Sequence, residues 1–221
     1  MKKYYLLFAI CLMTIKISLG QEFKVDQRTQ MEKEDPMKTY SPEETSILDL
    51  LEMIEVQGVR MNKFEFGKFD KDYKILLLSD KYDNGNLIKT DTLGQFESTY
   101  RYSEEEKPYY DYMDKIKIIT KDDDTKSELF IKTYAFYSKV KIELKRTNKN
   151  SFFNWRNYKN TSWKLNKKIP LMVFASSWKD EKYGFDRFCG VAHLTDNGKD
   201  TNELLAMSPS YVMIYYQVTE K

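Results

Sequence analysis

Residues 73–93 read YKILLLSDKYDNGNLIKTDTL, two β-prone segments on either side of a polar turn. The first segment runs through Ile75 and Leu77, and residues 87–93 return with similar character. Between them, Asp83-Asn84-Gly85-Asn86 is a strong turn signal, because Asn and Gly adopt positive φ at low cost. The stretch predicts a β-hairpin.

Short segments with apolar residues at alternate positions continue on both sides of this hairpin. Before it, the apolar positions are Val59, Met61, Phe64, Phe66 and Phe69. After it, we predict strands in residues 114–120, 127–137, 140–145, 171–178, 185–192 and 211–218. Residues 100–112 and 148–168 are rich in aromatic side chains and have no clear assignment. Many short strands predict a mainly β protein, best described as an antiparallel β-sandwich.

One N-terminal amphipathic helix is predicted before the strands. Ser41 suits the N-cap, Pro42 the first helical position, and Glu44 the capping box. Gly58 is a suitable C-terminal stop. Between these ends, apolar residues spaced by three and four predict one buried stripe, formed by Ile47, Leu48, Leu51 and Ile54.

The N-terminus has the layout of a secretory signal peptide. A basic start, Lys2 and Lys3, precedes the apolar run of residues 4–13, and small residues precede Gln21. We therefore predict a signal peptide in residues 1–20, a flexible lead in 21–40 and one mostly β domain in 41–221. The apolar run is too short to span a bilayer, so we expect no stable membrane span in the mature chain.

Loss of this peptide changes the charge of the chain. The full sequence has 36 Lys+Arg and 34 Asp+Glu, a net charge of +2. Residues 1–20 contain three lysines and no acid, so the mature chain has 33 basic and 34 acidic residues, or −1. A near-neutral chain argues against nucleic-acid binding. Residues 139–149 alternate basic and apolar side chains, which favours the solvent side of a strand over an anion-binding patch.

Cysteine and histidine are too few for the common catalytic and metal sites. Cys189 is the only cysteine outside the signal peptide and His193 the only histidine, so no disulfide can form within the mature chain. A thiol protease would need the two in contact, but on a strand they lie roughly 13 Å apart. We expect Cys189 to be a small buried hydrophobe. Two such ligands do not make a usual zinc site, and no Gly-x-Ser-x-Gly motif is present.

Two groups of acidic residues offer carboxylate oxygens, the kind of ligand that calcium binds. They are Asp122-Asp123-Asp124 with Glu128, and Asp80 with Asp83. Neither follows the spaced calcium-loop pattern with its central glycine, so we interpret both as charged hairpin turns. We predict no metal, no cofactor and no catalytic residue.

Aromatic residues are the best candidates for a binding site. Large amphipathic rings are enriched at binding surfaces, but they are also ordinary core residues of β-sheets. As ligand-binding candidates, with core packing as the alternative, we name Trp155, Tyr158, Trp163 and Trp178.

Five short motifs are spread along the chain, in residues 47–53 (ILDLLEM), 81–85 (KYDNG), 168–171 (KIPL), 176–178 (SSW) and 187–190 (RFCG). Together with the signal peptide, this ordered set resembles a family of secreted proteins of unknown function from Bacteroides-type bacteria. The resemblance implies export in a bacterium with two membranes, and no activity, cofactor or substrate. In such bacteria, Asp91-Thr92-Leu93 matches a short O-glycosylation pattern.

Together these observations favour a non-catalytic exported binding or interaction domain of the cell envelope, either periplasmic or extracellular. Its expected partner is a glycan or an envelope protein. One alternative is a carboxylate-dependent glycan hydrolase, which needs two carboxylates across a cleft. The other is a structural accessory subunit of an envelope complex, which would expose a large apolar patch.

Overall fold

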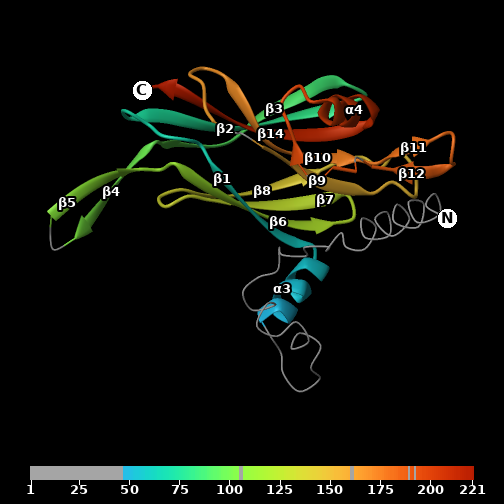
Figure 1. Ribbon diagram of the computed structural model, residues 1–221, viewed down its shortest axis with the longest axis horizontal. Coiled ribbons are helices and arrows are strands. Elements are labelled where there is room, and N and C mark those ends of the chain that lie inside the picture. Colours follow the sequence, from blue (N-terminus) through green and yellow to red (C-terminus); the bar gives the residue numbers. More distant parts are fainter. Residues whose placement is uncertain (1–46, 105–106, 160–161, 189, 192) are drawn as a thin grey trace, which may run out of the picture. The chain divides into compact units, whose positions relative to one another are not determined.

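The computed structural model describes residues 47–104, 107–159, 162–188, 190–191 and 193–221 (Figure 1). The predicted signal peptide and lead, the predicted start of the helix and Cys189 lie outside these ranges. The chain divides into two units, Met1–Glu52 and Met53–Lys221, and the second contains all of the strands. The described part of the chain is mainly β, as predicted.

The hairpin of residues 73–93 is confirmed. Strand β2 (Tyr73–Asp83) pairs antiparallel with β3 (Asn86–Glu97), and Asp83 faces Asn86 across the turn. Asn84 and Gly85 have φ values of 48° and 76°, as the two central positions of a tight hairpin turn require. The turn chemistry therefore sets the register of this pair.

The hairpin belongs to a six-stranded sheet with the order β13-β9-β10-β14-β2-β3. Its neighbours are antiparallel except β13 and β9, which are parallel. The remaining strands of this sheet are β9 (Phe153–Tyr158), β10 (Lys168–Ser176), β13 (His193–Leu194) and β14 (Ser210–Glu220).

A second sheet has four antiparallel strands in the order β1-β6-β7-β8. They are β1 (Val59–Glu65), β6 (Lys115–Asp123), β7 (Lys126–Lys132) and β8 (Tyr137–Glu143). On β6, Ile116 and Ile118 are buried, whereas Lys115 is exposed and Lys117 half-buried. This alternation gives the sheet an apolar inner face and a charged outer face. The basic residues of β8 lie on its solvent side, as predicted.

The inner face of the four-stranded sheet and one face of the six-stranded sheet share one hydrophobic cluster. Ile118 and Ile131 come from the first sheet, and Leu77, Ile214 and Tyr216 from the second; all are fully buried. At about 25 cal/mol per Å² of apolar surface removed from water, this cluster is the main favourable term in the stability of the fold.

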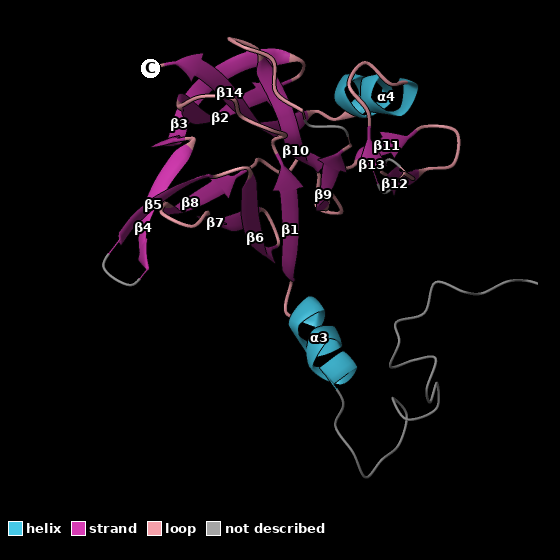
Figure 2. Ribbon diagram, turned by 60° about the vertical axis from the view of Figure 1, so that its left-hand side comes forward, coloured by secondary structure: helices cyan, strands magenta, loops and turns pink. Residues whose placement is uncertain are grey.

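The opposite face of the six-stranded sheet has its own smaller cluster, which contains Trp178, Leu194, Leu204 and Tyr211. Leu204 comes from helix α4 (Lys199–Met207), which lies beside this sheet (Figure 2). We did not predict this helix. It is short and polar, and no side chain caps its start at Gly198.

Two short hairpins complete the strands. Residues 100–112, left unassigned from sequence, form β4 (Thr99–Glu104) and β5 (Lys107–Tyr112), which project away from the two larger sheets (Figures 1 and 2). The predicted strand over 185–192 is shorter than expected: β12 (Phe185–Arg187) pairs with β11 (Trp178–Asp180).

Helix α3 (Ile47–Val56) lies within the predicted helix. Gly58, at φ 74°, stops it as expected, and its N–H donates to the carbonyl of Glu55. Two residues of the predicted apolar stripe, Leu51 and Ile54, are 55% and 46% exposed, so the structure does not bury these two as predicted.

Candidate functional site

Three lysines lie side by side on the outer face of the four-stranded sheet. In the strand register, Lys63 of β1 is the direct partner of Lys117 of β6, and Lys117 is the direct partner of Lys132 of β7. Adjacent strands are about 4.8 Å apart, so the three side chains span roughly 10 Å across the sheet. We call these residues the lysine row.

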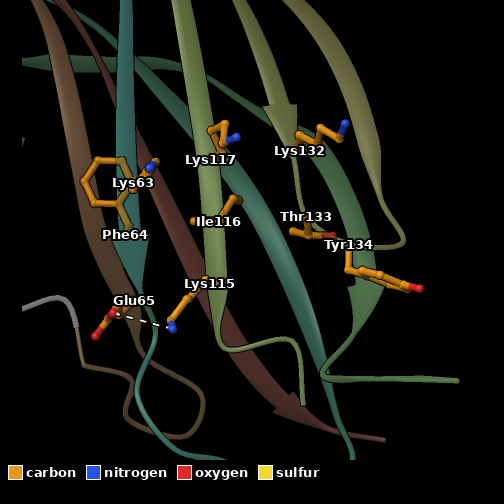
Figure 3. Close-up of a pocket in the computed structure, with 9 residues that line it drawn as sticks. All are labelled: Lys63, Phe64, Glu65, Lys115, Ile116, Lys117, Lys132, Thr133 and Tyr134. Atoms are coloured by element: carbon orange, nitrogen blue, oxygen red, sulfur yellow. Dashed lines mark ion pairs between the residues drawn. The ribbon is translucent and has the colours of Figure 1, made fainter. Parts of the chain in front are cut away.

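The lysine row borders a hollow of about 410 Å³. Figure 3 shows Lys63, Lys117 and Lys132 on three neighbouring strands, with Tyr134 beyond the end of β7. Lys115 and Glu65 lie on the same face, two residues from Lys117 and Lys63 respectively. They line the same hollow and form a loose ion pair at 3.9 Å. The hollow is open to solvent and large enough for a small ligand.

The three lysines of the row form no ion pair with an acid in the part of the chain that the structure describes. Glu65 is paired with Lys115, and no ion pair or hydrogen bond involves the ammonium groups of Lys63, Lys117 or Lys132. Like charges placed directly opposite each other on a sheet destabilise it. By this rule, the three neighbouring lysines weaken the four-stranded sheet instead of stabilising it.

An apolar row lies next to the lysines on the same face. Met61, Ile119 and Phe130 are direct cross-strand partners, and Met61 is 56% exposed. The ammonium group of Lys139 lies 4.9 Å from the centroid of the Phe130 ring, a cation–π distance. The face thus offers cationic groups beside apolar surface.

Exposed tyrosines lie at the β7 end of the lysine row. Tyr137 of β8 is the cross-strand partner of Lys132 and is 62% exposed. Tyr134, in the loop between β7 and β8, is 68% exposed, and its ring centroid lies 4.2 Å from that of Tyr100 on β4. Burial and the nearby Asp111 raise the pKa of the Tyr100 hydroxyl above its usual value.

The four aromatic residues named from sequence do not form one surface. Trp155 and Trp163 contribute to the cluster between the two larger sheets, whereas Tyr158 and Trp178 lie in the smaller cluster. Trp155, Tyr158 and Trp178 are each only 5% exposed. At this exposure, little of each ring surface can contact a ligand in the conformation that the structure describes.

Polar contacts of two of these aromatics are internal. Trp155 Nε1 donates to Asp122 Oδ1 at 3.0 Å, and Trp163 Nε1 donates to the carbonyl of Lys68 at 3.1 Å. The half-buried Trp163 ring stacks on Phe69 with centroids 5.5 Å apart. Ligand binding by these residues stays a prediction, and these contacts give it no support.

The acidic groups considered for calcium have protein partners. Asp80 is buried and accepts from Lys168 Nζ at 2.7 Å, and Asp124 forms an ion pair with Arg146 at 3.1 Å. Among the described residues, no group of three or more His, Cys, Asp or Glu is placed to hold a metal. His193 is exposed on β13. Cys189 lies outside the described residues, so the predicted separation of the two side chains stays a prediction.

Carboxylates with shifted pKa values do not resemble a hydrolytic acid. A hydrogen bond from the Tyr73 hydroxyl lowers the pKa of Asp70. Burial alone would raise the pKa of Asp72, but hydrogen bonds from Lys221, Thr99 and Ser98 outweigh it and lower the value. A general acid of a glycosidase needs the opposite shift.

Within the described residues, no helix is both long enough and apolar enough to cross a membrane. Comparison with the curated proteins gave no match, and comparison with the solved structures gave none either. One family model, described as a domain of unknown function (DUF5041), matches residues 29–220. That match covers most of the chain, which therefore belongs to the DUF5041 family.

Proposed function

We propose that this protein is a non-catalytic binding domain that holds an anionic ligand on the lysine row. One observation carries the proposal: three lysines are direct cross-strand neighbours without an acidic partner among the described residues. An anion above the row would offset part or all of this positive charge, and charge-assisted hydrogen bonds to ammonium groups are among the strong polar contacts of proteins.

The chain is further proposed to act outside the cytosol, in the periplasm or outside the cell. Support comes from residues 1–20, whose basic start, short apolar run and small residues before Gln21 suit a signal peptide. The two sheets are proposed to form a β-sandwich, since one hydrophobic cluster draws on both. In this arrangement the outer face of the four-stranded sheet points away from the shared cluster and is proposed to bind a ligand of the cell envelope.

Binding is favoured over hydrolysis for reasons of charge. The hollow is lined by Lys63, Lys115, Lys117 and Lys132 and by a single carboxylate, Glu65. A retaining or inverting glycosidase needs a pair of carboxylates. The accessory-subunit alternative draws support from a different feature, the exposed apolar side chains of α3, among them Leu51 and Val56.

Titration calorimetry in a chloride buffer tests the proposal, with sulfate, polyphosphate and acidic oligosaccharides as probes. We expect saturable binding of at least one probe, and loss of most of that binding in Lys117→Gln. Lys121→Gln is the matched control, because Lys121 lies on the same strand and the same face but does not line the hollow. Equal affinities for the two variants, or no binding of any anion, would refute the proposal.

A further inference from the structure

The surroundings of the lysine row indicate more than a site for a small inorganic anion. Tyr134 lines the hollow, and Tyr137 continues the row beyond Lys132. Both rings are more than 60% exposed, at 68% and 62%. An inorganic anion gains nothing from exposed aromatic rings, whereas a ligand with a ring of its own can pack against them.

Tyr134 packs against one neighbouring ring, which restricts its motion. The Tyr100 ring, 4.2 Å away between centroids, covers one face of Tyr134 and itself packs against the shared core. The large exposure of Tyr134 therefore belongs to its other face and its edges. A side chain that is already ordered loses less entropy when it binds, which favours affinity.

The β4–β5 hairpin projects away from the two larger sheets (Figure 2), and ring contacts lead from Tyr134 to further tyrosines on this hairpin. The centroid distances are 6.0 Å from Tyr100 to Tyr102 and 5.5 Å from Tyr102 to Tyr109. We call Tyr134, Tyr100, Tyr102 and Tyr109 the tyrosine ladder. It extends the aromatic surface from the hollow out along the hairpin, so an elongated ligand can contact both the lysines and the ladder.

We propose that the ligand is an acidic oligosaccharide. Its carboxylate or sulfate groups lie over the lysine row, and a neighbouring sugar ring packs on the open face of Tyr134. This inference rests on the proposed function and adds the class of ligand. The C–H groups on one face of a sugar ring suit the negative face of an aromatic ring. A neutral glycan would leave the three lysines uncompensated.

Single-stranded nucleic acid also combines phosphates with rings that stack on tyrosine. The charge of the chain favours the carbohydrate. Lys+Arg exceed Asp+Glu by only two in the full sequence, 36 against 34, whereas nucleic-acid-binding domains are normally strongly basic. The signal-peptide pattern of residues 1–20 also favours a ligand outside the cytosol.

The test compares ligands of similar charge that differ in their rings. The probes are oligogalacturonate, hyaluronan and heparin oligosaccharides, with polyphosphate as an anion without rings and oligo-dT as the nucleic acid. We expect at least one acidic oligosaccharide to bind roughly tenfold more tightly than polyphosphate, the difference that a well-placed aromatic contact supplies. Carboxylated and sulfated members of the panel distinguish the two anionic groups.

Variants separate the two parts of the site. Tyr134→Ala should weaken the oligosaccharide roughly tenfold and leave polyphosphate unchanged, while Lys117→Gln should weaken both. Tyr183→Ala is the matched control, because Tyr183 is 60% exposed and does not line the hollow. Polyphosphate or oligo-dT binding as tightly as the best oligosaccharide would overturn the inference while leaving anion binding intact. No binding of any anion would refute the proposed function as well.

Discussion

The lysine row makes a prediction about stability that is independent of any ligand. Lys117 has a like charge directly opposite it on each side, Lys63 and Lys132. A cross-strand charge pair contributes roughly 0.2–1 kcal/mol, and we take about 0.5 kcal/mol for each. Lys117→Gln removes two repulsive pairs and should raise the free energy of unfolding by about 1 kcal/mol. Lys117→Glu also creates two attractive pairs and should raise it by about 2 kcal/mol.

Thermal unfolding measures this effect. For a domain of this size, 1 kcal/mol shifts the midpoint by roughly 2–4 °C, so we expect gains of about 2–4 °C for Gln and 4–8 °C for Glu. The gains should be largest at low ionic strength and nearly vanish at about 1 M salt, where the Debye length is about 3 Å. The buffer must hold no sulfate or phosphate, because a bound anion would mask the repulsion.

Lys121 supplies a control with the opposite sign. It lies on the same strand and face as Lys117, but its partner on β7 is Glu128. Lys121→Glu replaces an attractive pair by a repulsive one and should lower the midpoint by a few degrees. If Lys117→Glu and Lys121→Glu shift the midpoint in the same direction, or if salt does not change the shifts, the lysine row is not a source of repulsion.

Three further predictions concern the fold. Leu77→Ala should lower the free energy of unfolding by about 2–5 kcal/mol in denaturant titrations, since Leu77 is fully buried in the shared core; a smaller loss would place it outside a packed core. Gly58→Ala should destabilise more than Gly85→Ala in calorimetry. Both glycines have positive φ, but a Cβ at Gly58 would lie 2.6 Å from a backbone oxygen, whereas one at Gly85 meets nothing within 4 Å. The hydrogen bond from Lys221 helps to lower the pKa of Asp72 in the folded protein. Ionised Asp72 therefore stabilises the fold above its unfolded pKa, and this stabilisation is lost as pH falls through the folded pKa. Asp72→Asn should therefore reduce the fall in the free energy of unfolding as the pH is lowered into the acid range. An equal fall in the variant and the wild type would contradict this.

Turn chemistry and alternation explain why much of the sheet structure was predictable. Asn84 and Gly85 both adopt the positive φ that their residue types favour, and the burial of residues along β6 and β7 keeps a period of two. The β4–β5 hairpin escaped prediction because tyrosines lie on both of its faces. Tyr102 pairs with Tyr109 and Arg101 with Tyr110, so apolar and polar positions do not alternate clearly.

The lysine row could not be predicted from the sequence for a different reason. Lys63 and Lys117 lie 54 positions apart in the sequence, and only the register of β1 against β6 makes them partners. A shift of one residue would move one of them to the inner face. Local sequence indicates that each lysine faces solvent, but it contains no information about its lateral neighbours. The aromatic residues of 148–168 show the same limit, because composition allowed both a core and a surface role, and only the pairing of β9 places Trp155 in the core.

The effects of Lys117 on stability and on anion binding can be measured in one variant. Natural sequences tend to break local rules of stability where a function compensates. If the row exists to bind an anion, Lys117→Glu should give a protein that is more stable without ligand and that no longer binds it. Addition of the ligand should then raise the unfolding midpoint of the wild type but not that of the variant. A variant that is more stable and still binds would place the site elsewhere, and would leave the repulsion between these lysines without a functional explanation.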